Sequence, residues 1–161
     1  MPPLILQALA ADASVMDNFP LVRNTYKRRH RWPGRHAAFD HFRPKDVFRY
    51  WSDEALWDYV NHSLHEDESG DLVLTYTREW EAHFYKLPPQ DVWQLLPIIS
   101  QPTLAIRGAG SDALFSEAWQ LWQELQPQAT FVEIAAAGHM VPMERPQKVA
   151  EQILNFLHGS K

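Results

Sequence analysis

The sequence has 161 residues, of which 45% are apolar and 22% charged, with a formal net charge of −5. This is the size and balance of a globular chain that buries a core, so a disordered or membrane-spanning protein is excluded. The acidic balance gives no general attraction to nucleic acid or to acidic membranes. The lack of cysteine excludes disulfides, thiol catalysis and cysteine-based zinc sites.

Residues 1–96 predict one helix after another, because prolines and capping residues punctuate their apolar pattern. No Lys or Arg precedes the first apolar stretch, as a secretory signal would require, so we expect a cytoplasmic protein. Ser52 and Thr77 are good caps for two of the helices. We expect helices over residues 2–11, 19–32, 35–42, 53–65, 77–85 and 92–96, an acidic turn over 66–71 and an extended piece over 72–76.

Residues 97–161 predict a different order: strand, helix, strand, helix. Residues 103–106 and 130–134 are short apolar runs typical of buried parallel strands. Residues 116–125 and 146–157 are amphipathic, and Pro146 stands at the first position of the last helix. Such a unit is right-handed, and its ligands lie beyond the carboxyl ends of the strands.

Two side chains in the loops that leave these strands could carry acid–base chemistry. His139 lies in the segment Gly-His-Met-Val-Pro, and Asp112 ends the segment Gly-Ala-Gly-Ser-Asp. An imidazole that titrates near neutrality suits a general base, and a carboxylate can orient it. The plainer alternatives are a loop histidine with no special task and a carboxylate that caps the turn before Leu114.

The two segments together resemble the carboxyl-terminal half of an α/β-hydrolase. Residues 102–112 are similar to that family's penultimate strand and acid loop, and residues 138–146 to its histidine loop and final helix. The resemblance implies an α/β fold with a helical cap or lid region over residues 1–96 and a core segment over 97–161. It implies His139 and Asp112 as catalytic residues, with no metal and no cofactor. Aromatic residues of the cap would bind a small, apolar, ester-like substrate, with candidates Trp51, Trp57, Trp80, Phe84 and Tyr85.

The sequence departs from this family in one large respect. The family places its nucleophile in a Gly-x-Ser-x-Gly elbow after earlier strands, and no serine of this sequence has those flanking glycines. We therefore expect ester or lactone-type hydrolysis only in the complete fold. The alternative is a catalytically incomplete fragment or a homodimerising interaction module. The expected partners are a second copy of the chain or an amino-terminal hydrolase half.

Two other groups of residues suggest weaker alternatives. Six basic residues between positions 23 and 35 could touch phosphates, although a solvated helix face is the better interpretation in an acidic protein. His62 with His65, and His36 with Asp40, have helical spacing suited to a metal ion. No third ligand follows either pair at a diagnostic spacing.

Overall fold

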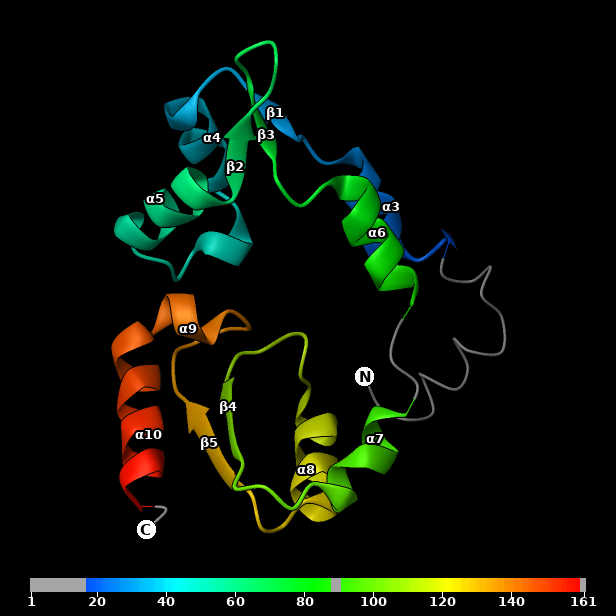
Figure 1. Cartoon of the computed structure of the whole chain (residues 1–161), viewed down its shortest axis with the longest axis vertical. Coiled ribbons are helices and arrows are strands. Elements are labelled where there is room, and N and C mark those ends of the chain that lie inside the picture. The colour runs from blue at the N-terminus through cyan, green and yellow to red at the C-terminus, as the bar shows by residue number, and fades with distance from the viewer. Residues whose placement is uncertain (1–16, 88–90, 160–161) are drawn as a thin grey trace. The chain divides into compact units, whose positions relative to one another are not determined.

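The computed structural model describes residues 17–87 and 91–159, and these two stretches form two separate compact units (Figure 1). The sequence predicts a boundary after residue 96, whereas the division falls between residues 87 and 91. Helix α7 (Val92–Leu95) and the 3-10 helix η2 (Leu96–Ile98) belong to the second unit because η2 packs against helix α8 (Ser116–Leu125) of that unit. The helix expected over residues 2–11 lies outside the described residues.

The amino-terminal unit, residues 17–87, combines short helices with a three-stranded antiparallel sheet. In chain order its elements are α3 (Pro20–Lys27), β1 (Arg31–Trp32), α4 (Arg35–Phe42), η1 (Asp46–Phe48), α5 (Asp53–His62), β2 (Leu64–Glu66), β3 (Leu72–Leu74) and α6 (Arg78–Lys86). The strand order in the sheet is β1-β3-β2. Helices α3 and α6 pack against each other, and so do α4 and α5.

Side-chain caps begin two of these helices at the predicted residues. The hydroxyl of Ser52 accepts a hydrogen bond from the amide of Ala55, and that of Thr77 accepts one from Trp80. Each bond satisfies an amide that has no partner within the helix. The prediction of one helix over residues 19–32 is wrong, because α3 ends at Lys27 and the chain then pairs with β3.

The carboxyl-terminal unit, residues 91–159, has the predicted order of strand, helix, strand, helix. After α7 and η2 it contains β4 (Leu104–Gly108), α8 (Ser116–Leu125), β5 (Thr130–Ile134), α9 (Val141–Glu144) and α10 (Pro146–Gly159). Strands β4 and β5 pair in parallel, with Leu104 opposite Thr130 and Gly108 opposite Ile134. This confirms the predicted parallel unit. The short helix α9 is an addition that the sequence pattern did not predict.

Alternation along the strands gives this small sheet two covered faces. On one face, the ring of Phe131 meets that of Trp119 of α8 edge to face, with centroids 5.1 Å apart. On the other, Ile134 joins a buried cluster with Ala137 and Val141, against which Val149 of α10 packs. The strands therefore lie between α8 and α10 (Figure 1), and the sheet directs its carboxyl ends into the two loops of interest.

None of the helices within residues 17–87 and 91–159 is long and apolar enough to cross a membrane.

Candidate active site

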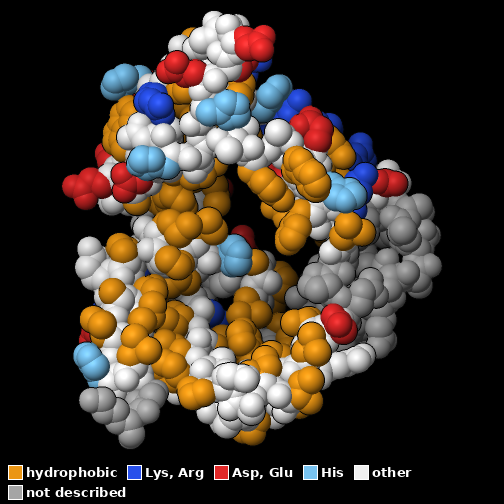
Figure 2. Space-filling model, viewed as in Figure 1, with side chains coloured by type: hydrophobic (Ala, Val, Ile, Leu, Met, Phe, Trp, Pro, Cys, Tyr) orange, Lys and Arg blue, Asp and Glu red, His pale blue; other side chains and the backbone are white. Residues whose placement is uncertain are grey.

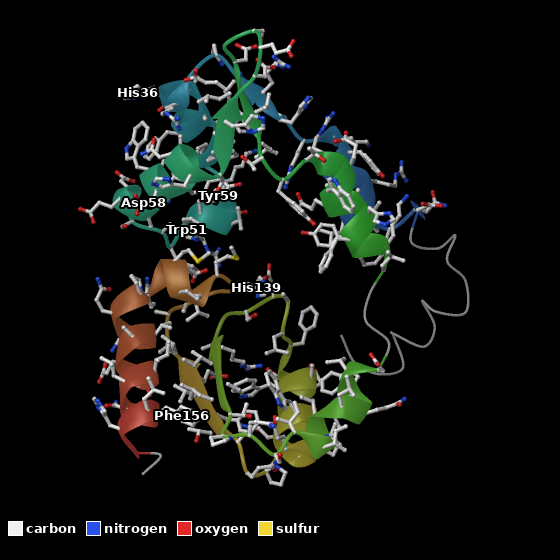
Figure 3. All side chains as sticks on the ribbon, viewed as in Figure 1. His36, Trp51, Asp58, Tyr59, His139 and Phe156 are labelled. Carbon is white, nitrogen blue, oxygen red and sulfur yellow. The ribbon has the colours of Figure 1, made fainter. Side chains whose placement is uncertain are left out.

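The two candidate catalytic residues lie in the loops that leave adjacent parallel strands. Asp112 lies in the acid loop, residues 109–115 between β4 and α8. His139 lies in the histidine loop, residues 135–140 between β5 and α9 (Figure 3). Both side chains are exposed. Because β4 and β5 are parallel and in register, both loops start from the same edge of the sheet.

The backbones of the two loops are in direct contact. The amide of Gly110 donates a hydrogen bond to the carbonyl of Ala137 at 2.9 Å, and the amide of Ala109 donates one to Ile134 at 3.0 Å. A Cβ atom at Gly108 would overlap the carbonyl oxygens of Ala137 and Gly138. Glycine at position 108 therefore allows the backbones of the acid loop and the histidine loop to come close enough for these hydrogen bonds.

A buried carboxylate holds the backbone on both sides of His139. Glu144 is only 7% exposed. Its carboxylate accepts hydrogen bonds from the amide of Gly138 and, at 3.1 Å, from the amide of Met140. Bonds from amides to a carboxylate are charge-assisted and stronger than those to a neutral acceptor. Glu144 thus fixes the two residues that flank the imidazole.

The next residue, Arg145, holds the histidine loop from the other direction. Its guanidinium donates hydrogen bonds to the carbonyls of Glu144, at 2.6 Å, and of Ala136. Ala136 has a φ angle of 55°, a left-handed conformation that a non-glycine residue adopts at a cost. The turn after β5 is therefore constrained by contacts with the start of the closing helices.

Arg107 anchors the acid loop from within β4. This residue is 8% exposed, and its Nε donates to the carboxylate of Glu133 on β5 at 2.7 Å. Its Nη1 donates to the carbonyl of Leu114 at 3.2 Å, and its guanidinium lies 5.2 Å from the ring centroid of Trp119. Arg107 consequently ties the end of the acid loop to both strands and to α8.

Ser111, and not Asp112, closes the turn in the acid loop. The hydroxyl of Ser111 accepts a hydrogen bond from the amide of Leu114 at 3.2 Å. Within the described residues, the carboxylate of Asp112 and the imidazole of His139 make no hydrogen bond, with each other or with other groups. The structure therefore brings the two loops together and leaves both side chains exposed to solvent. Their catalytic roles stay predictions.

The five aromatic residues expected to bind substrate lie in the amino-terminal unit but do not form one wall. Trp51 packs in the core against Phe48 and Tyr59, and Trp57 stacks on Phe39 at a centroid distance of 4.3 Å. Trp80 is 65% exposed beside His83. Phe84 and Tyr85, by contrast, line one hollow of this unit.

The roles of Arg107 and Glu144 were not predicted from the sequence, although each residue left a signal there. Arg107 and Glu133 are the charged residues of two otherwise uncharged strands, and they lie directly opposite each other. Glu144 follows Met140 by four positions at the start of a helical turn, where a carboxylate can reach back to free amides. The first signal required knowledge of which strands pair, and the second required knowledge of the fold of the loop.

The structure also describes the residues that the sequence suggested as a phosphate site or as metal ligands. Part of the basic stretch is paired, because Arg28 forms an ion pair with Glu81 and Arg31 bonds Asp67 and Asp71. Among residues 17–87 and 91–159, no three histidine or acidic side chains lie close enough together to hold a metal ion.

Known proteins with similar sequences are α/β-hydrolases by name. The abhydrolase domain-containing protein AKT2 of Alternaria alternata is 23% identical over 173 residues, which cover 85% of this chain and 65% of that protein. A second Alternaria alternata protein of the same description, AFT2-1, is 23% identical over 83% of this chain and 64% of its own length. No protein-family model matches the sequence.

Solved structures give the same result for the fold. The structure of E-2-(acetamidomethylene)succinate hydrolase matches 91% of this chain and 53% of its own, with a TM-score of 0.71 and 16% identity. An esterase from M. tuberculosis matches 98% of this chain and 52% of its own, with a TM-score of 0.68 and 17% identity. This chain thus spans about two thirds of the curated relatives and about half of these solved chains.

These matches confirm the resemblance drawn from residues 102–112 and 138–146. The chain has a partial α/β-hydrolase fold, corresponding to the carboxyl-terminal half of that fold.

Proposed function

We propose that this chain supplies the acid and the base of a catalytic triad that hydrolyses esters or lactones. His139 takes the proton of the nucleophile as general base and returns it to the leaving group as general acid. Asp112 orients the imidazole and stabilises the imidazolium that forms. The substrate is a small, apolar, ester-like molecule.

One observation carries this proposal: the hydrogen bond from Gly110 to Ala137, which joins the two loops at the carboxyl ends of β4 and β5. Each of these residues lies two positions before a candidate catalytic residue, Asp112 or His139. Ligand sites of open α/β sheets lie at this edge. The buried carboxylate of Glu144 supports the proposal, because it holds the backbone on both sides of the imidazole.

The nucleophile and the oxyanion donors of the proposed triad come from another segment of polypeptide. The sequence contains no Gly-x-Ser-x-Gly elbow, and a histidine without a nucleophile and oxyanion donors has little hydrolytic power. The chain alone is therefore proposed to turn over esters only slowly. Activity of normal size requires the complementing half of the fold.

Turnover of 4-nitrophenyl butyrate tests this function. The assay uses the chain alone and the chain co-expressed with the amino-terminal half of an α/β-hydrolase that carries a Gly-x-Ser-x-Gly elbow. We expect His139→Ala to abolish turnover and Asp112→Asn to lower it by at least tenfold. The control is His158→Ala, which removes an exposed imidazole from the end of α10 in the same unit. Equal turnover by the unmodified chain and by His139→Ala would contradict the proposal. So would the absence of turnover both in the chain alone and in the co-expressed chain.

A second candidate function is an interaction module that pairs with a second copy of the chain. Within residues 91–159, β4 pairs only with β5, so its other edge has free backbone groups. Helix α10 exposes the apolar side chains of Ile153, Leu154 and Leu157 by 43%, 53% and 61%, and hydrophobic side chains cover much of this unit in Figure 2. Burial of both features in a two-fold dimer would stabilise it.

Light scattering tests this second candidate. It predicts a mass of at least twice 18.7 kDa, the mass of one chain. Leu157→Lys places a charge on the apolar face of α10 and should shift the mass to that of the monomer. Gln147→Lys, at another exposed position of the same helix, should not. A monomer for the unmodified chain at high concentration would exclude this function.

A further inference from the structure

The amino-terminal unit contains a hollow of about 430 Å³ between the end of α3, α5, β3 and α6. This volume falls within the range of small-molecule sites, roughly 300 to 1,000 Å³. The residues that matter for its chemistry are Arg28, Tyr59, Tyr76, Glu81, Phe84 and Tyr85. All lie within residues 17–87, so the hollow is a feature of this unit alone.

Two charged groups of the hollow neutralise each other. Arg28 and Glu81 form a two-pronged ion pair, in which Nη1 of Arg28 donates to Oε1 of Glu81 at 3.0 Å and Nη2 donates to Oε2. The hydroxyl of Tyr85 donates to the same Oε1 at 3.0 Å. Glu81 thus accepts three hydrogen bonds from two side chains, and its charge is held in place at the wall of the hollow.

Some hydrogen-bond donors at the hollow remain available to a ligand. A guanidinium has five N–H groups, and within the described residues Arg28 uses two of them, both on Glu81. The hydroxyl of Tyr59, on α5 (Figure 3), makes no hydrogen bond in that part of the chain. Burial raises the pKa of Tyr59 above its usual range, so this hydroxyl keeps its proton at neutral pH.

The remaining wall of the hollow is mostly aromatic, and this favours a ligand with an aromatic ring system. Phe84 is 67% exposed and Tyr76 is 53% exposed, so their rings are available for stacking. A flat aromatic molecule gains most from such rings, by burial of area and by ring contacts. The available donors of Arg28 and Tyr59 then require an oxygen acceptor on that molecule.

The charge of Glu81 decides between two kinds of acceptor. A carboxylate bound to Arg28 would lie close to the carboxylate of Glu81, and like charges at such a distance repel each other. A neutral carbonyl oxygen accepts the same hydrogen bonds without that repulsion. We propose that this hollow binds neutral aromatic carbonyl compounds, with the carbonyl oxygen accepting from Arg28 and Tyr59.

Three probes of matched shape test the proposal on the full chain by equilibrium dialysis. They are 2-acetylnaphthalene, which has a neutral carbonyl, 2-naphthoate, which is anionic, and 2-ethylnaphthalene, which has no acceptor. We expect 2-acetylnaphthalene to bind about tenfold more tightly than either of the others. This comparison needs no variant. It also needs no turnover, so its outcome is separate from that of the proposed hydrolysis.

Variants then assign the contacts. Tyr59→Phe removes one hydroxyl and should weaken 2-acetylnaphthalene by about fivefold without changing 2-ethylnaphthalene. Glu81→Gln removes the repelling charge and should tighten 2-naphthoate by about tenfold. Tyr50→Phe and Glu68→Gln, outside the hollow, are the matched controls. Circular dichroism verifies folding, and Arg28→Lys is the second variant should Tyr59→Phe not fold.

Four outcomes would overturn this inference. They are the absence of binding by every probe, equal binding of the three probes, strongest binding of 2-naphthoate, and an unchanged preference for 2-acetylnaphthalene in both Tyr59→Phe and Arg28→Lys. Equal binding would indicate adsorption to an apolar surface. A preference for 2-naphthoate would indicate an anion site.

Discussion

The amide of Gly110 donates a hydrogen bond to the carbonyl of Ala137 at 2.9 Å, and this bond joins the acid loop to the histidine loop. It lies just beyond the last paired residues of β4 and β5, next to the bond from the amide of Ala109 to the carbonyl of Ile134. The separation of the two loops is therefore set by backbone hydrogen bonds, which side-chain motion does not disturb. What remains variable is the orientation of the two exposed side chains.

Gly108→Ala should strongly destabilise the carboxyl-terminal unit. The added Cβ would overlap the carbonyl oxygens of Ala137 and Gly138, and backbone cannot move aside as a flexible side chain can. We expect a loss of about 2 kcal/mol or more in the free energy of unfolding, measured by urea denaturation. Hydrogen exchange of the β4 and β5 amides reports on this unit alone.

Gly159→Ala is the control for that change. A Cβ at Gly159, also in the carboxyl-terminal unit, meets no atom within 4 Å, so the unfolding curve should stay close to that of the unmodified chain. If Gly108→Ala is equally harmless, the close approach of the two loops is not a requirement of this fold.

Glu144→Gln should loosen the histidine loop. The amide group that replaces the carboxylate keeps one acceptor oxygen, so one of the two amides at Gly138 and Met140 loses its partner in a buried place. A buried amide without a partner costs about 1 to 3 kcal/mol. We expect that loss in urea denaturation, with faster hydrogen exchange at Gly138 and Met140.

Glu151→Gln serves for comparison with Glu144→Gln. Glu151 is an exposed residue of α10, and its change should stay within about 0.5 kcal/mol. Unchanged exchange rates at Gly138 and Met140 in Glu144→Gln would show that its carboxylate does not hold this loop.

The parts of the fold that the sequence predicted are those specified locally. Ser52 and Thr77 cap their own helices, and the strand over residues 130–134 and the helix over 116–125 have the predicted bounds because each carries its own apolar pattern. The two-residue strand β1 was missed because it depends on pairing with β3, about forty residues further along the chain. Local propensity contains no information about such a partner.

The same distinction applies to the candidate site. The sequence predicted the placement of Asp112 and His139 in loops after parallel strands, since each loop follows its own strand. It did not predict the contacts of Arg107 and Glu144, because these require the register of β4 on β5 and the fold of the loop itself. The five aromatic residues expected to bind substrate do not lie together, for a related reason. Aromatic residues fill cores as readily as pockets, and Trp51 packs in the core here.

Arg107→Met should destabilise the unit more than Glu133→Gln does, although the two residues form one ion pair. The side chain of Arg107 is 9% exposed and that of Glu133 is 44% exposed. Loss of the guanidinium leaves the carbonyl of Leu114 without its side-chain donor and removes the contact with Trp119. When Glu133 loses its charge, by contrast, water can partly replace the carboxylate as a partner of Arg107.

A double-mutant cycle measures the coupling between these two residues. We expect about 2 kcal/mol for Arg107→Met and a coupling energy of about 1 kcal/mol, the range of partly exposed ion pairs. Arg107→Lys, which keeps the charge but not the planar fork, should fall between the unmodified chain and Arg107→Met. A cost for Glu133→Gln equal to that of Arg107→Met would contradict this interpretation of the acid loop's anchor.

Tyr85 should make the stability of the amino-terminal unit fall in strong alkali. Burial, and then the charge of Glu81, raise the pKa of Tyr85 to about 12 in the folded chain. A raised pKa means that the unfolded chain releases its proton first, near pH 10. The contribution of Tyr85 to stability is therefore complete below about pH 10 and is lost as the pH rises towards about 12.

Phenolate absorbance at 295 nm measures this shift. The difference between titrations of the unmodified chain and of Tyr85→Phe isolates one phenol and should show a midpoint near pH 12. The same difference in urea-unfolded chains should give a midpoint near pH 10. Identical midpoints in the two states would mean that the hydroxyl of Tyr85 is not buried against Glu81, and the arrangement of donors around that carboxylate would then have to be different.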